Sequence, residues 1–138
     1  MVDVFSKHKR SDIMSRVRNK KTGPEDIVAG LIRLLGIRYR RNVTTLPGKP
    51  DFFIRSAKTA VFVHGCLWHG HEGCNRGKLP TTNREFWEKK ITTNRMRDVR
   101  AVRQLRKLGM HVMIIWQCKL QKPEQVIIRL RKMLIGKA

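Results

Sequence analysis

Residues 50–64, PDFFIRSAKTAVFVH, carry the pattern from which the sheet of this protein can be predicted. It holds two apolar runs, 51–55 and 59–64, separated by a short turn at 56–58. β-Branched and aromatic residues favour extended backbone, so the two runs predict neighbouring strands of a hairpin. A third run, MHVMIIW (110–116), is almost continuously apolar, which is typical of a strand buried on both faces.

Helical patterns surround these strands. One helix is predicted over 22–36, a long one from Asn83 to about Leu108, and a last one from Pro123, while 37–41 is a weaker extended run. This order of elements predicts an α/β fold: a four-stranded mixed sheet flanked by helices, with a crossover through the long helix. The side of the long helix expected to face the core carries Phe86, Ile91, Val99, Val102, Leu105 and Leu108.

The composition favours a nucleic-acid partner. The 138 residues are expected to form a single domain, 1–138, with 31 Lys and Arg against 10 Asp and Glu and a formal net charge of +21. An acidic membrane surface is the weaker alternative partner. The chain has no apolar run of the roughly 20 residues that a membrane helix needs and no apolar leader, so a cytoplasmic location is expected. A basic N-terminal arm, 1–21, could dock on DNA or stay solvated.

The cysteines predict a structural zinc site. Cys66, His71 and Cys74 follow the spacing C-x4-H-x2-C in an irregular loop, 65–82, and Cys118 comes shortly after the apolar run 110–116. Two loop cysteines, one histidine and a distant cysteine make the four ligands that closed zinc sites use. Two alternatives stay open: three small buried thiols, or a neighbouring histidine as the nitrogen ligand.

A second group of residues suits phosphodiester chemistry. Asp51 opens one strand of the hairpin, and Val63 and His64 lie on the next, where a divalent cation could join protein and phosphate. Glu25 could add another oxygen, and His64 and His69 are left for proton transfer. An aspartate after proline is far more often a turn or capping residue, which is the plain alternative.

Two tryptophans lie close to these histidines in the sequence. Trp68 falls in the loop, and Trp87 in the first turn of the long basic helix. Either could anchor the core, or could stack on or wedge between bases. Trp116, inside the run 110–116, is assigned to the core.

Taken together, the motifs make the chain similar to the very-short-patch-repair (Vsr) mismatch endonucleases, which have the fold of the PD-(D/E)XK nucleases. The matching segments together span residues 1 to about 120, nearly the whole chain. They are V-D-V-F-S-K-H-K-R-S-x-x-M (2–14), LPGKPDFF (46–53), VFVHGCLWHGHEGC (61–74), P-T-T-N-R-E-F-W-x-x-K-I (80–91), N-x-x-R-D (94–98) and LGMHVMIIWQC (108–118).

The resemblance implies an enzyme and its substrate. Such an enzyme would be a Mg²⁺-dependent endonuclease that nicks one strand of duplex DNA 5′ to the thymine of a T·G mismatch. These mismatches arise when 5-methylcytosine deaminates, so the family accompanies DNA cytosine methyltransferases. A nick in one strand needs a single active site, which favours a monomer, and mismatch-repair proteins are candidate partners.

The resemblance also assigns roles to the candidate active-site residues. It implies Asp51 as the principal Mg²⁺ ligand, with the backbone carbonyl of Val63 as the second, at a position where the family commonly has threonine. His69 would be the acid–base residue. His64 and Asp98 would orient water around the metal, and Glu25 would support the site from the first helix.

The same comparison covers the zinc and DNA-contacting residues. The family's zinc ligands fall on Cys66, His71, Cys74 and Cys118, with one residue inserted between His71 and Cys74. Three residues match the aromatic side chains that the family pushes into DNA beside the mismatch: Trp68, Trp87 and Leu67, where leucine replaces the usual phenylalanine.

Two other functions remain open from the sequence. A zinc-stabilised DNA-binding module without catalysis would explain the charge, the cysteines and the tryptophans. A nuclease of the same fold could instead cut another DNA structure or sequence.

Overall fold

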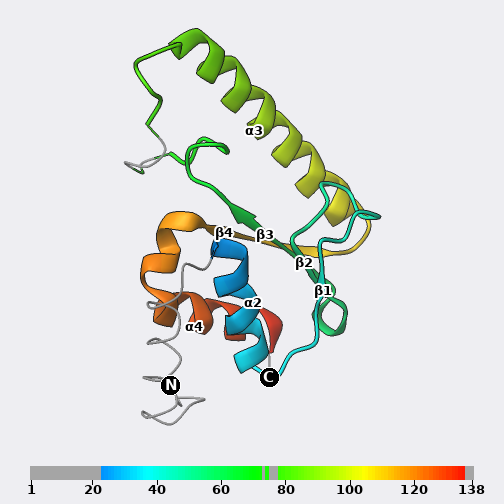
Figure 1. The fold of residues 1–138 in the computed structure, drawn as a ribbon. Helices are drawn as coiled ribbons and strands as arrows, with labels where there is room; N and C mark the ends of the chain where they lie inside the picture. Colours follow the sequence, from blue (N-terminus) through cyan, green and yellow to red (C-terminus); the bar gives the residue numbers. More distant parts are fainter. Residues whose placement is uncertain (1–22, 73, 75–77, 136–138) are drawn as a thin grey trace.

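The computed structural model describes residues 23–72, 74 and 78–135 (Figure 1), so the predicted basic arm, 1–21, lies outside the described residues. The fold is α/β. Its strands are β1 (Arg40–Arg41), β2 (Phe52–Ile54), β3 (Thr59–His64) and β4 (His111–Trp116), and its described α-helices are α2 (Pro24–Leu34), α3 (Arg84–Lys107) and α4 (Pro123–Leu134). Two short 3-10 helices, η1 (Arg55–Ala57) and η3 (Gln117–Gln121), follow β2 and β4.

The four strands form one mixed sheet in the order β1-β2-β3-β4. β1, β2 and β3 pair antiparallel, whereas β3 and β4 pair parallel, with α3 in the crossover between them. The predicted four-stranded mixed sheet flanked by helices is confirmed. The predicted strand 37–41 is shorter at its start and pairs only through Arg40–Arg41; it ends where predicted, before Asn42 with its left-handed φ of 54°.

Helices cover the two faces of the sheet unequally (Figure 1). α2 and α4 pack on one face around the main core, which includes Leu31, Phe52, Met113 and Leu130. α3 meets the other face over a much smaller core made by Ala60, Phe62 and Leu105. The larger core stabilises the sheet from the side of α2 and α4, while the face toward α3 is only partly covered and could hold a site.

Two predictions about burial are wrong because α3 covers only a small part of its face of the sheet. α3 leans away from the sheet, so Phe86, Val99 and Leu108 are more than half exposed, and Ile91, Ala101 and Leu105 are its buried residues. β4 is buried on one face only, through Met113 and Ile115, whereas Val112, Ile114 and Trp116 are half-buried.

Between α3 and the partly covered face of β4 lies a cavity of about 820 Å³. Its lining includes Val99, Val102 and Ile114. α3 is long but strongly polar, and no helix in the described part of the chain is long and apolar enough to cross a membrane.

Candidate active site and metal centre

The hairpin of β2 and β3 places the first candidate residues. Asp51 lies directly before β2, and Val63 is the second-last residue of β3. Antiparallel pairing brings these two positions together, and the backbone N–H of Val63 donates a hydrogen bond of 2.7 Å to Asp51 Oδ2. The structure therefore brings together the aspartate and the neighbouring strand, as the sequence predicted.

The surroundings of Asp51 disfavour its charged form. Burial, together with a hydrogen bond and charge repulsion from Glu25, raises the pKa of Asp51 to about 6, although the hydrogen bond from the Val63 N–H and the nearby His69 lower it. The first turn of α2 supplies Glu25, whose Oε2 lies 3.8 Å from Arg41 Nη2. Two carboxyl groups in one partly buried place favour either a shared proton or a cation. Asp51, Glu25 and the backbone of Val63 are thus suited to hold a divalent metal.

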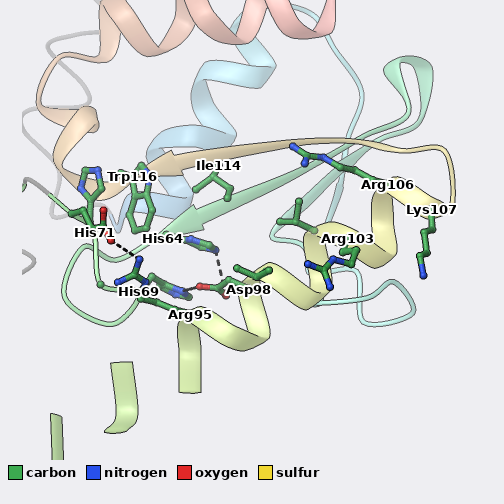
Figure 2. A pocket seen from close by; sticks show the side chains of 14 residues that line it. His64, His69, His71, Arg95, Asp98, Arg103, Arg106, Lys107, Ile114 and Trp116 are labelled. Atoms are coloured by element: carbon green, nitrogen blue, oxygen red, sulfur yellow. Dashed lines mark hydrogen bonds and ion pairs between the residues drawn. The ribbon is translucent and has the colours of Figure 1, made fainter. Parts of the chain in front are cut away.

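A histidine and an aspartate meet beside this carboxylate pair. His69 comes from the loop after β3 and Asp98 from the middle of α3, and His69 Nδ1 lies 2.6 Å from Asp98 Oδ2 (Figure 2). His69 also lies close enough to Asp51 to lower its pKa. A carboxylate that holds one ring nitrogen fixes the orientation of the imidazole, which can then exchange a proton at Nε2.

His64 supports this pair as a neutral ring. It is only 4% exposed, and burial, together with the neighbouring His69, lowers the pKa of His64 to about 4, although Asp98 opposes the shift. The His64 and His69 rings stack at 3.8 Å with an angle of 3° between their planes.

The ligand atoms of His64, His69 and Asp98 lie within 4.8 Å of one another, close enough to suggest a metal centre. However, a ring nitrogen binds a metal in the plane of its ring, and two nearly parallel stacked rings with centroids 3.8 Å apart do not direct their nitrogens to one point. The arrangement suits proton transfer better than metal binding.

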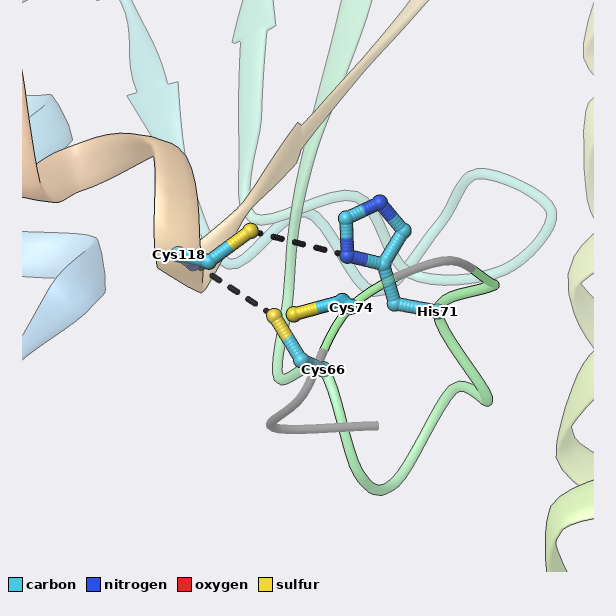
Figure 3. Close-up of side chains that lie close together, drawn as sticks. All are labelled: Cys66, His71, Cys74 and Cys118. Atoms are coloured by element: carbon cyan, nitrogen blue, oxygen red, sulfur yellow. Dashed lines mark hydrogen bonds between the residues drawn. The ribbon is translucent and has the colours of Figure 1, made fainter. Parts of the chain in front are cut away.

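Four side chains in and beside the loop after β3 form a second cluster that could hold a metal (Figure 3). The ligand atoms of Cys66, His71, Cys74 and Cys118 all lie within 4.8 Å of one another, and Cys118 Sγ is 3.5 Å from His71 Nδ1. A tetrahedral zinc ion with bonds of about 2.0–2.3 Å separates its ligands by about 3.5–3.8 Å. The cluster therefore fits a zinc ion with little rearrangement.

Electrostatics at the cluster agree with this. Burial raises the pKa of the Cys66 thiol to about 11, although the Cys118 N–H, 3.4 Å from Cys66 Sγ, lowers it. A thiol that is costly to ionise without a metal gives up its proton when a metal binds, so metal binding and folding are coupled.

The candidate DNA-contacting residues lie in the same loop and on α3. Trp68 is 49% exposed, and its ring meets Trp87 edge to face at 5.3 Å. Leu67 is half-buried. Trp68 and Leu67 directly precede His69, so a contact made by either is next to the catalytic candidates.

Two residues that hold this loop were missed from the sequence. Asn94 Nδ2 donates a hydrogen bond of 2.7 Å to the backbone carbonyl of Trp68. Gly70 has a φ of 61°, and a Cβ there would lie 2.6 Å from Ile91 of α3, so the loop packs closely on the helix. Asn94 precedes Asp98 by one helical turn, and this spacing could have placed both on one face of α3.

Comparison with known proteins identifies the family of the chain. The sequence model of the family "DNA mismatch endonuclease Vsr" matches residues 2–76. The DNA mismatch endonuclease Vsr of Escherichia coli (strain K12) is 38% identical over 126 residues, which is 91% of this chain and 80% of that protein. The type II nicking enzyme V.NmeAIP of Neisseria meningitidis is 42% identical, over 88% of this chain and 86% of the relative. The nicking enzyme V.XorIIP of Xanthomonas oryzae pv. oryzae is 41% identical, over 97% of this chain and 98% of that protein.

The chain therefore belongs to the Vsr family of DNA mismatch endonucleases, a class of enzymes that hydrolyse DNA. The prediction of an endonuclease is confirmed at this level, and the hypothesis of a non-catalytic module is set aside. The roles of individual residues stay predictions.

Proposed function

We propose that residues 1–138 form a Mg²⁺-dependent endonuclease domain that nicks one strand of duplex DNA 5′ to the thymine of a T·G mismatch. The observation that carries the proposal is the convergence of two groups at one end of the sheet. One is the carboxylate pair Asp51 and Glu25 beside Val63, and the other is the His69–Asp98 pair. Similarity to proteins named nicking enzymes supports a cut in one strand.

Asp51, the backbone carbonyl of Val63 and Glu25 would hold Mg²⁺. Bound there, the ion would stabilise negative charge on the phosphate and make the attacking water more acidic. The raised pKa of Asp51 supports this assignment, because a buried carboxylate pair gains most from a cation. Valine in place of the threonine common in the family leaves a backbone carbonyl ligand intact.

His69 would transfer a proton at Nε2 during phosphodiester hydrolysis. Asp98 holds the ring through Nδ1 at 2.6 Å, and His64 supports one face of it by stacking. The lowered pKa of His64 keeps this supporting ring neutral near pH 7, which avoids a second positive charge against His69. The two histidines therefore have different roles although their rings lie in contact.

Zinc would bind Cys66, His71, Cys74 and Cys118 and fasten the loop that carries His69. Structural zinc sites close with four such ligands and contribute their binding free energy to folding. This role is separate from that of Mg²⁺, since the cysteine cluster leaves no ligand position for phosphate.

Leu67, Trp68 and Trp87 would test base stacking at the mismatch. Trp68 is half exposed beside Trp87, as a wedge residue must be. Leucine at position 67 can wedge but stacks poorly, so the affinity for the mismatch should depend mainly on the two tryptophans.

The partner is double-stranded DNA, whose phosphates the basic arm 1–21 and the basic side of α3 would hold. The enzyme would act as a monomer on DNA in the cytoplasm, associated with the nucleoid. Mismatch-repair proteins are its candidate partners.

A strand-resolved nicking assay tests the proposal. Labelled duplexes that differ only in one T·G or T·A pair are incubated with Mg²⁺ or with EDTA. A single Mg²⁺-dependent nick beside the mismatched thymine is the expected result. Equal cutting of both duplexes would keep the nuclease and refute the mismatch specificity, while cutting in EDTA would refute the metal requirement.

A further inference from the structure

Trp116 lies between the two candidate centres of the molecule (Figure 2). It is the last residue of β4 and pairs in register with His64 of β3. Its ring stacks on His71 at 4.1 Å with an angle of 8° between the planes, and meets the His64 ring edge to face at 5.2 Å. One indole therefore contacts a zinc-ligand candidate and a histidine of the active site.

His64 depends on such ring contacts for its orientation. Its buried Nδ1 has no hydrogen-bond partner among the residues that the structure describes, and its Nε2 lies 3.9 Å from Asp98 Oδ1, beyond hydrogen-bonding distance. The ring is held by His69 on one side, by Trp116 and, more loosely, by Phe62 at 5.7 Å. Without the indole, His64 would be free to rotate, and His69 would lose the surface on which it stacks.

The contact on the other side orients His71. Stacking fixes the plane of the His71 ring, and in that plane Nδ1 lies 3.5 Å from Cys118 Sγ. Cys118 follows Trp116 by two residues, so a short segment positions both a zinc ligand and the ring that orients another.

We propose that Trp116 is a positioning residue that couples the zinc centre to the His64–His69 pair. Part of this inference rests on the proposed function, because it assumes that proton transfer occurs at His69. A purely structural role does not account for the residue, since Met113 and Ile115 provide the buried face of β4 while Trp116 is half-buried beside the cavity.

The test compares Trp116→Met, Trp116→Leu and Trp116→Phe with the control Val112→Ala. Methionine and leucine fill part of the space without a ring, and phenylalanine restores a ring. Val112 lies on the same face of the same strand and packs on the smaller core instead. Three quantities are measured: kcat and KM for nicking a T·G duplex, the rate of zinc release to a chromogenic chelator, and the ring ¹⁵N signals of the histidines.

In Trp116→Met we expect kcat to fall by about tenfold or more, with KM within about twofold, because outer contacts of a metal or catalytic site typically contribute about 10- to 100-fold. Zinc release should be faster by a similar factor, and the His64 and His69 signals should shift. Trp116→Phe should restore both rates to within about threefold of wild type, and Val112→Ala should change neither.

Wild-type kcat, zinc release and His64 signals in a folded ring-less variant would overturn the inference, as would a change confined to one of the two centres. Trp116→Leu takes the place of Trp116→Met if the latter does not fold. If the wild-type protein nicks no duplex, the proposed function fails, and zinc release and the histidine signals still decide whether Trp116 couples the two centres.

Discussion

Replacing Asp98 with asparagine tests the proposed proton-transfer role of His69 separately from its place in the fold. The His69 Nδ1 to Asp98 Oδ2 distance is 2.6 Å, and the two side chains are 27% and 25% exposed. Asparagine keeps the shape of the side chain but loses the charge that holds and polarises the imidazole. A hydrogen bond to a charged group contributes about 1.5–3 kcal/mol, and each 1.36 kcal/mol of barrier is about tenfold in rate, so nicking should slow by about 10- to 150-fold.

The assay is single-turnover nicking of a T·G duplex with enzyme in excess, so that binding and product release do not limit the rate. Glu72→Gln is the matched control. Glu72 Oε1 also lies 2.6 Å from a cationic nitrogen, Arg95 Nη2, but these side chains are 78% and 50% exposed. Exposed ion pairs contribute little, so this variant should nick within about threefold of wild type. Equal rates for Asp98→Asn and wild type, or an equal loss in Glu72→Gln, would refute the reasoning.

Three further predictions concern the zinc centre, the buried histidine and the wedge. Cys118→Ser should lose zinc and lower the midpoint of thermal unfolding by about 10 °C, because zinc at about 100 times its Kd stabilises the folded state by about 3 kcal/mol; a variant that keeps one zinc per chain would contradict this. His64 has a pKa lowered to about 4, below its unfolded value of 6.5, so the unfolded chain binds the extra proton and stability falls as the pH falls from 6.5 towards 4. His64→Phe should remove this loss, worth about 2–3 kcal/mol between pH 7 and 4.5 in urea titrations. The raised pKa of Asp51 makes the free energy of unfolding change with pH in the opposite direction, but Asp51 is present in both wild type and His64→Phe. Equal dependence of the free energy of unfolding on pH in the two proteins would therefore contradict the assignment to His64. Trp68→Ala should weaken binding to a T·G duplex by about tenfold, as the loss of one stacking side chain does, with little effect on T·A binding. Anisotropy with Ca²⁺ in place of Mg²⁺ measures both, and equal losses would exclude a wedge.

Much of the site could be predicted because short-range sequence features control it. The turn at 56–58 is so short that β2 and β3 must pair, which brings Asp51 to Val63. Parallel pairing of β3 with β4 brings the segments after them, with Cys66 and Cys118, to the same end of the sheet. Spacing along the chain therefore indicated which residues come close together, whereas their roles as metal ligands were implied by the family resemblance and stay predictions.

The angle between α3 and the sheet could not be predicted in the same way. Periodicity shows which residues share a face of a helix, but it does not show whether another element covers that face. Val99 was therefore expected in the core and lies beside a cavity instead. Trp116 was assigned to the core for a similar reason, since an apolar run does not reveal that one side of its strand faces two histidine sites.

Single-turnover nicking of a T·G duplex by Asp51→Asn in Mg²⁺ shows directly whether Asp51 is needed for cleavage. Because burial raises the pKa of Asp51, a neutral side chain there should leave the metal-free protein at least as stable as wild type at pH 7.5. We expect a folded variant that holds zinc, binds the duplex and does not nick it. A variant that is free of other nucleases and nicks at the wild-type rate would contradict the assignment of this site.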